Sequence, residues 1–251
     1  MTSEHRLHEH VALVTGASRG LGRHIARHLA AAGAVVAVNY AHDEAGAAQT
    51  VREIREAGGV AQAFRADVTD RDAVVALVAE IEAAWDSPVR ILINNATGPQ
   101  PGRTVQDSNW GDYLDQLRFF VEAPLHLLQA VLPGMRAAGS GSVVNIGSDV
   151  VQQGLPRCAP YVAAKAAMVG LTRSWASELG PEGIRVNLVA PGWVPVERHA
   201  GADTTDHVAR VPLGRVGAPA DIAETVTFLA SPQASFITGQ CLSVNGGVTF
   251  E

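Results

Sequence analysis

Cysteine, long apolar runs and a surplus of positive charge are all scarce in this sequence. The two cysteines among 251 residues, Cys158 and Cys241, lie far apart and outside any CxxC pattern. They are therefore predicted to be small buried residues in a reducing compartment, without a disulfide. No apolar run approaches the ~18 residues that a membrane-spanning helix needs, and the polar first ten residues lack the apolar core of a signal peptide. The sequence thus predicts a cytoplasmic protein with no membrane contact.

The charge balance also argues against a class of partner. The formal net charge is −6 at pH 7, so no basic surplus can replace the counterions of a phosphate backbone, and nucleic-acid binding is not expected. A hydrophobic content of 47% with 18% charged residues is typical of a soluble globular protein. Because no linker, repeat or low-complexity tract divides the chain, one domain is predicted over residues 1–251.

Short β-branched runs alternate with longer helical patterns along the chain. The runs predict seven strands, at 11–15, 34–39, 60–66, 89–94, 141–147, 184–190 and 240–245. Helices are predicted at 20–32, 44–57, 71–85, 110–137, 160–179 and 219–230, with a kink at Pro124. Several strands are apolar along most of their length, which predicts an α/β fold with one doubly wound parallel sheet covered by helices on both faces. Residues 191–217 lack clear periodicity and are predicted to be a substrate loop, the alternative being a surface excursion.

A strand, a glycine-rich turn and a helix open the chain in "VALVTGASRGLGRHIARHLAAAG" (11–33). Gly16, Gly20 and Gly22 are spaced G-x3-G-x-G. Glycines let a pyrophosphate approach the backbone closely, and a helix start offers free N–H groups and a positive dipole. Because Ser18 can add a hydroxyl donor, the stretch predicts a dinucleotide-binding site.

The choice of dinucleotide depends on charge near the adenosine ribose. Proteins that bind NAD place an acidic side chain at the end of the second strand. Here that strand ends in Asn39 and Tyr40, and the acids Asp43 and Glu44 come later. Arg19 in the turn could face a 2′-phosphate, although it could equally be solvated. NADP(H) is therefore favoured, with NAD(H) as the alternative.

Tyr161 and Lys165 stand four residues apart in "PYVAAKAAM", on one face of a predicted helix, and Ser148 precedes Tyr161 by thirteen residues. Together with the glycine-rich turn, these motifs resemble the short-chain dehydrogenase/reductase family. Further matches are "DV" at 67–68, "NNA" at 94–96, "APG" at 190–192 and "GQCLSVNGG" near the end. The resemblance covers nearly the whole chain, implies a Rossmann-type fold, and is strongest to bacterial 3-oxoacyl-carrier-protein reductases and related ketoreductases.

The resemblance implies an NADPH-dependent reductase of ketones or 3-oxoacyl groups that works without a metal. Hydride transfer builds negative charge on the carbonyl oxygen, so Tyr161 would donate a proton and Ser148 a hydrogen bond. Lys165 would lower the pKa of the phenol and hold the nicotinamide ribose. The implied cofactor contacts are Gly16, Ser18, Arg19, Gly20, Leu21, Gly22, Asn39, Asp67, Val68, Asn94, Ala96, Tyr161, Lys165, Pro191 and Gly192. The substrate would be a small carbonyl compound or acyl thioester, and family members commonly form homodimers or homotetramers.

Three positions depart from the family pattern. Phe120 stands where the family has an asparagine that helps to hold a water linking the lysine to solvent. Thr97 replaces a glycine beside the cofactor, and Val196 replaces a hydroxyl residue that contacts the carboxamide. Either another group holds the water and the enzyme is active, or the protein binds its cofactor with weak or no reductase activity. NAD-dependent alcohol oxidation is a third alternative.

Overall fold

The sheet predicted from the sequence is present in the computed structural model, which describes residues 7–8, 10–197, 201 and 203–250. Within these residues, seven parallel strands form one sheet in the order β3-β2-β1-β4-β5-β6-β7. They are β1 (Val11–Val14), β2 (Val35–Tyr40), β3 (Val60–Arg65), β4 (Val89–Asn94), β5 (Gly141–Ile146), β6 (Ile184–Pro191) and β7 (Cys241–Val244). Each strand end lies within one residue of its predicted position. The strand order reverses between β1 and β4, which makes the sheet doubly wound.

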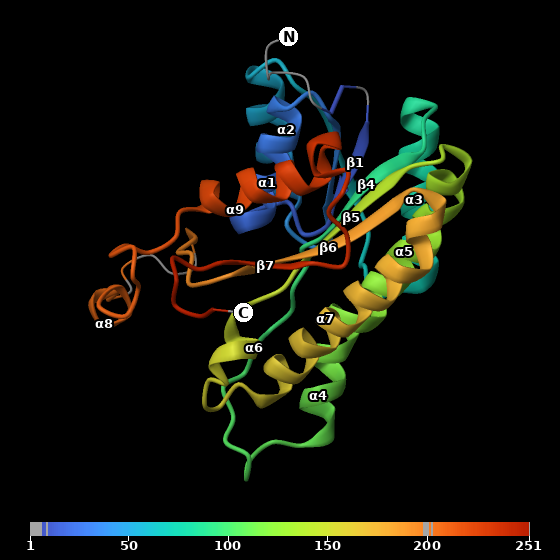
Figure 1. The fold of residues 1–251 in the computed structure, drawn as a ribbon. Helices are drawn as coiled ribbons and strands as arrows, with labels where there is room; N and C mark the ends of the chain where they lie inside the picture. Colours follow the sequence, from blue (N-terminus) through green and yellow to red (C-terminus); the bar gives the residue numbers. More distant parts are fainter. Residues whose placement is uncertain (1–6, 9, 198–200, 202, 251) are drawn as a thin grey trace.

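Helices cover both faces of the sheet, as the alternating pattern predicts (Figure 1). The long helices are α1 (Gly20–Ala31), α2 (Glu44–Glu56), α3 (Arg71–Trp85), α5 (Ala123–Ala137), α7 (Ala159–Leu179) and α9 (Pro219–Ala230). The short ones are α4 (Trp110–Leu117), α6 (Val150–Gln153) and α8 (Thr205–Val208). Side chains of α1, α2 and α9 share one hydrophobic cluster with the sheet, and those of α3, α5 and α7 share another. The sheet is thus buried on both faces, which explains its apolar strands.

The helix predicted over 110–137 is divided in the structure. α4 is followed by a π-helical segment, Arg118–Glu122, and only then by α5. Pro124 is the second residue of α5 and has no N–H to donate to the carbonyl four residues earlier. In a π turn, each N–H donates instead to the carbonyl five residues earlier. The interruption expected at Pro124 therefore takes the form of a wider turn. That turn holds Phe120, whose side chain is only 2% exposed.

The carboxyl ends of the strands meet at one edge of the sheet, where the site-forming segments gather. α4 and α6 lie beyond this edge, and α8 stands apart from the sheet (Figure 1). The predicted substrate loop, 191–217, begins at the end of β6 and contains α8. Residues 198–200 and 202 of that loop lie outside the described residues. In the part of the chain that the structure describes, no helix has the length and apolarity that a membrane span requires.

Candidate active site

The glycine-rich turn between β1 and α1 has a backbone that only glycine adopts easily. Gly16 and Gly20 have φ angles of 61° and 58°, in the left-handed region. A Cβ atom on Gly22 would collide with the carbonyl oxygen of Gly16, so the missing side chain lets the start of α1 pack against the turn. Ser18 is buried in the turn, and Leu21 packs against the hydrophobic cluster behind it. Backbone N–H groups of the turn can therefore come within hydrogen-bond distance of a ligand that binds over the start of α1.

Asn39 holds this turn from beneath. Its side chain is 2% exposed, its Oδ1 accepts a 3.3 Å hydrogen bond from the N–H of Gly16, and its Nδ2 donates to the carbonyl of Ala66 at 3.1 Å. The sequence predicts a direct cofactor contact for Asn39. In the structure the amide is buried and bonded on both sides, and it shapes the turn. The cofactor contact stays a prediction.

The two asparagines of "NNA" have different environments. Asn94 is buried and donates to Oδ1 of Asn145 at 2.8 Å, which ties β4 to β5. Asn95 donates from Nδ2 to the carbonyl oxygens of Thr15 at 2.8 Å and Gly16 at 3.2 Å. The backbone N–H groups of Asn95 and Ala96 donate to the Thr15 hydroxyl. The sequence pattern predicts cofactor contacts for Asn94 and Ala96 but none for Asn95, although the motif contains it.

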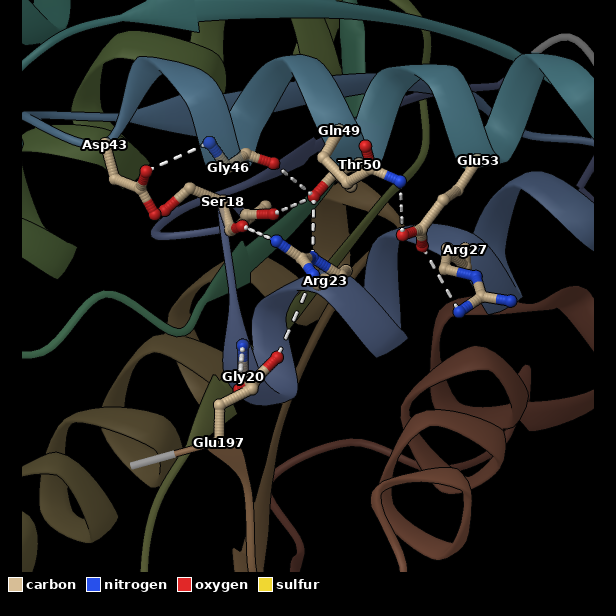
Figure 2. Close-up of polar contacts among 11 residues, drawn as sticks. Ser18, Gly20, Arg23, Arg27, Asp43, Gly46, Gln49, Thr50, Glu53 and Glu197 are labelled. Carbon is tan, nitrogen blue, oxygen red and sulfur yellow. Dashed lines mark hydrogen bonds and ion pairs between the residues drawn. The ribbon is translucent and has the colours of Figure 1, made fainter. Parts of the chain in front are cut away.

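An acidic side chain from the loop after β6 reaches the first residue of α1 (Figure 2). Oε2 of Glu197 accepts a hydrogen bond of 3.1 Å from the N–H of Gly20, and Oε1 lies 3.9 Å from Nη1 of Arg23. Arg23 is itself held by the carbonyl of Ser18 at 2.6 Å and the hydroxyl of Thr50 at 3.2 Å. A carboxylate on a helix N-terminus beside a guanidinium marks an anion site. The donor set fits the diphosphate of a dinucleotide.

Two arginines lie near the part of the turn where the sequence predicts the adenosine ribose. Arg19 precedes α1 and is exposed, and Arg65 at the end of β3 donates to the carbonyl of Ala41 at 3.3 Å. Asp43, the first acid after β2, accepts from the N–H of Gly46 at 2.9 Å and so caps α2 (Figure 2). Of the predicted "DV" pair, Asp67 accepts from the neighbouring Thr69, while Val68 is buried.

Lys165 is buried where α7 meets the end of β5. Its Nζ donates to the carbonyl oxygen of Ile146 at 2.6 Å, and its side chain is 4% exposed. Burial lowers the pKa of this ammonium from 10.5 to about 7. One turn earlier on α7, the ring centroid of Tyr161 lies 5.7 Å from Nζ. Lys165 is also the only lysine among the 19 lysine and arginine residues of the chain.

Ser148 follows β5 directly, two residues beyond the Ile146 carbonyl that binds Lys165. Its hydroxyl accepts a 3.3 Å hydrogen bond from the N–H of Val150. The pairing of β5 with β6 brings Pro191 and Gly192 to the same edge, where the N–H of Gly192 donates to the carbonyl of Val244 at 3.0 Å. The predicted catalytic and nicotinamide-side residues thus lie on adjacent segments at the carboxyl ends of β5 and β6.

A pocket of about 240 Å³ opens beside Tyr161. Besides Tyr161, its walls include Gln100, Pro101, Gln116, Val150 and Leu155. Cys158 also contributes, as a half-buried free thiol. Gln116 could not be predicted as a pocket residue, because a glutamine within a predicted helix carries no local signal of a binding role. Trp193, in the loop after β6, packs edge-to-face on His207 with ring centroids 5.0 Å apart.

Asp149 is an acidic residue at this edge of the sheet for which the sequence predicts no role. It follows Ser148 and is 3% exposed, and burial raises the pKa of its carboxyl, opposed by hydrogen bonds from Gln153 and Asn245. A Cβ atom on Gly192 would lie 3.4 Å from its Oδ2. Pro191 and Gly192, which are predicted to contact the nicotinamide, lie at the same edge of the sheet as Ser148. A buried carboxyl therefore lies beside these residues.

Known proteins resemble this chain in sequence and in fold. Residues 16–249 match a family model described as Enoyl-(Acyl carrier protein) reductase. The chain is 40% identical over 248 residues to the 3-oxoacyl-[acyl-carrier-protein] reductase FabG of Staphylococcus aureus, covering 94% of this chain and 97% of that protein. It is 38% identical over 243 residues to FabG of Vibrio cholerae, covering 95% and 96%. The crystal structure of a dehydrogenase/reductase from Sinorhizobium meliloti matches with a TM-score of 0.91 and 34% identity, covering 97% of this chain and 96% of that one.

Proposed function

Because the chain belongs to the short-chain dehydrogenase/reductase family, we propose that it reduces a ketone or 3-oxoacyl thioester to the alcohol, with NADPH as the reductant. The observation that carries this proposal is the buried ammonium of Lys165, held by the Ile146 carbonyl one helical turn from Tyr161. That pair lies next to a pocket large enough for a small substrate group. The names of the two FabG relatives, 3-oxoacyl-[acyl-carrier-protein] reductases, agree with this assignment.

The residues present fit a nicotinamide dinucleotide. The N–H of Gly20 and the guanidinium of Arg23, which already hold a carboxylate, would hold the diphosphate. Asp67 and Val68 would border the adenine, and Ala96, Pro191 and Gly192 the nicotinamide. When bound, the nicotinamide would supply the hydride for the carbonyl carbon. Lys165 would donate to the ribose hydroxyls with the hydrogens not taken by Ile146.

Tyr161 is proposed as the proton donor. An unperturbed phenol has a pKa near ~10 and is a poor acid at neutral pH, but a nearby cation favours the phenolate and lowers that pKa. Nζ of Lys165 lies 5.7 Å from the centroid of the Tyr161 ring and can supply that cation. Ser148 would donate its hydroxyl hydrogen to the carbonyl oxygen as negative charge develops there.

The preference for NADPH rests on the charges at the adenosine end. Arg19 is exposed beside the turn, and Arg65 lies at the end of the neighbouring strand. One oxygen of the Asp43 carboxylate caps α2, which ties this acid to the start of that helix. The two guanidinium groups favour a 2′-phosphate at this place.

The proposed activity is tested by following cofactor oxidation with NADPH and with NADH against 3-oxoacyl thioesters, cyclic ketones and sugars. We expect turnover with NADPH and at least one 3-oxoacyl thioester, and much slower turnover with NADH. Absence of cofactor oxidation with every substrate, although NADPH binds, would contradict the proposal. That result would favour the second candidate, a cofactor-binding protein without reductase activity.

The second candidate is supported by Phe120, which cannot hold the water that an asparagine would hold. The variant Phe120→Asn discriminates between the two candidates. A large gain in turnover would indicate that the native protein has an impaired proton path, whereas no gain would indicate that its active site works without that water. We expect no gain.

Self-association is also proposed. Four apolar side chains near the C-terminal part of the chain are exposed: Phe228 at 37%, Phe236 at 103%, Leu242 at 42% and Phe250 at 84%. Apolar surface of this kind is commonly covered by a partner subunit. We expect a homodimer or homotetramer, and light scattering coupled to size-exclusion chromatography would measure its mass. A monomer at micromolar concentration would contradict this part of the proposal.

A further inference from the structure

The side chain of Phe120 lies directly on the ammonium of Lys165. Nζ is 3.7 Å from the centroid of the Phe120 ring, and both side chains are buried, at 2% and 4% exposure. The same ring makes an edge-to-face contact with Tyr161, with centroids 5.4 Å apart. The π-helical segment Arg118–Glu122 brings Phe120 to this position. One aromatic ring therefore contacts both members of the proposed catalytic pair.

The surroundings of the ammonium leave few other partners for its charge. An ammonium has three N–H donors, and the Ile146 carbonyl takes one of them at 2.6 Å. Among the described residues, the hydrophobic cluster around Phe120 consists of Ala164, Met168, Leu188 and Ala190. Its titratable members are the partly buried Tyr161 and the free thiol of Cys241. Burial alone, without a carboxylate partner, accounts for the lowered pKa of Lys165. The ring face, with its centroid 3.7 Å from Nζ, thus adds a source of negative potential to that of the Ile146 carbonyl.

We propose that Phe120 is a positioning residue, whose ring face holds the ammonium of Lys165 in place and in its charged form. The face of an aromatic ring attracts a cation through its quadrupole, most strongly where water is excluded, and does not attract a neutral amine in this way. Phe120 therefore opposes the effect of burial on the lysine. The ring thus stabilises the ammonium in place of the asparagine-held water that the family pattern has here. The remaining N–H groups can then face Tyr161 and a bound ribose.

The catalytic consequence of this inference rests on the proposed function, but the contact itself can be measured without turnover. Because Lys165 is the only lysine in the sequence, protein labelled with 13C-lysine gives a single set of lysine side-chain signals. In the native protein, the ε-CH2 protons should be shifted upfield by the ring current of Phe120. The pH titration of the same signal gives the pKa of Lys165 directly.

The decisive experiment replaces Phe120 by phenylalanines with one, two and three ring fluorines. Fluorine withdraws electrons from the ring face and changes its shape little, so the variants fold alike. We expect the pKa of Lys165 to fall stepwise, by about one pH unit over the series, if the ring stabilises the cation. A pKa that does not follow the fluorine number would overturn the proposal.

Two leucine variants provide matched controls for loss of a buried ring. Phe120→Leu should lose the upfield shift of the ε-CH2 protons. Phe64→Leu removes an equally buried ring (1% exposed) that packs on Trp85, and should leave the lysine signal where it is. An unchanged lysine signal in Phe120→Leu would show that the ring does not lie on the ammonium, whatever the enzyme's activity.

Kinetics then separate this inference from the proposed function. If the protein reduces ketones, the upper pKa of the pH profile of kcat/KM should fall in the same order as the lysine pKa across the fluorinated series. A merely structural role of Phe120 would reduce activity without moving that pKa, and this outcome would contradict the inference. If no ketone is reduced, the proposed function fails, while the lysine titration still decides whether Phe120 stabilises the charge.

Discussion

The carboxylate of Glu197 accepts a hydrogen bond of 3.1 Å from the backbone N–H of Gly20, at the first residue of α1. Glu197 belongs to the loop that follows β6, whereas Gly20 belongs to the proposed diphosphate site (Figure 2). The contact places a negative charge at the helix N-terminus, where a phosphate would be expected. A cofactor bound as proposed would therefore compete with the loop for the same donors.

Replacing Glu197 by Gln should strengthen cofactor binding. The variant keeps the size of the side chain but removes the charge that competes with the diphosphate, so we expect the Kd for NADPH to fall by about 3–10-fold. Titration calorimetry at low salt measures it, and Glu178→Gln, an exposed glutamate on α7, serves as the control. Equal or weaker binding in Glu197→Gln would show that the carboxylate does not compete.

Replacing Tyr161 by Phe should abolish ketone reduction and leave NADPH binding nearly intact. The variant loses only the hydroxyl that donates the proton, and such donors typically contribute 10²–10⁴-fold to the rate. Turnover is measured by NADPH oxidation, and binding by the change in cofactor fluorescence. Near-native turnover in this variant would remove Tyr161 from the mechanism.

Replacing Arg19 by Ala should reduce the preference for NADPH over NADH. A guanidinium contact to a 2′-phosphate is a charge-assisted hydrogen bond, so the KM for NADPH should rise by about tenfold while that for NADH changes little. The exposed Arg173 on α7, changed to Ala, is the control. If both cofactors are affected equally, Arg19 contacts a part that they share.

Replacing Lys165 by Met should raise the free energy of unfolding above that of the native chain. This gain should be largest at neutral and acidic pH and smaller at alkaline pH. Burial lowers the pKa of Lys165 from 10.5 to about 7, so between these values the unfolded chain binds more protons and native stability rises with pH. Methionine carries no charge and removes the cost of burial. Urea unfolding at pH 6, 7, 8 and 9 should show the advantage of the variant shrinking above pH 7, and a constant difference would contradict the lowered pKa.

Replacing Asp149 by Asn should raise the unfolding temperature at neutral pH. Burial raises the pKa of this carboxyl, so the folded state binds more protons than the unfolded state over the interval between the two pKa values, and stability is lost as pH rises through it. The gain should be roughly 3 °C at pH 7.5 and should vanish near pH 4. Scanning calorimetry at both pH values measures it, with the exposed Asp206→Asn as control. A loss of stability at pH 7.5 would show that the charged form is favoured.

Local patterns in the chain were sufficient to predict the elements of the fold. The strands are apolar because both faces of the sheet are covered, and the glycines of the first turn are required by positive φ angles, so both leave a signal within a few residues. The spacing of Tyr161 and Lys165 is likewise a property of one helix. The exception is the helix predicted over 110–137, because a π turn has no distinct sequence period.

The sequence by itself therefore determined the doubly wound sheet, the glycine-rich turn and the tyrosine–lysine pair, since each depends on the backbone geometry of neighbouring residues. Only the tertiary structure decided that Asn39 supports the turn from beneath, that Glu197 reaches the start of α1 and that the ring of Phe120 lies on the ammonium of Lys165. These contacts join residues from distant elements. Their geometry follows from strand order and helix packing, for which a linear sequence carries no periodic signal.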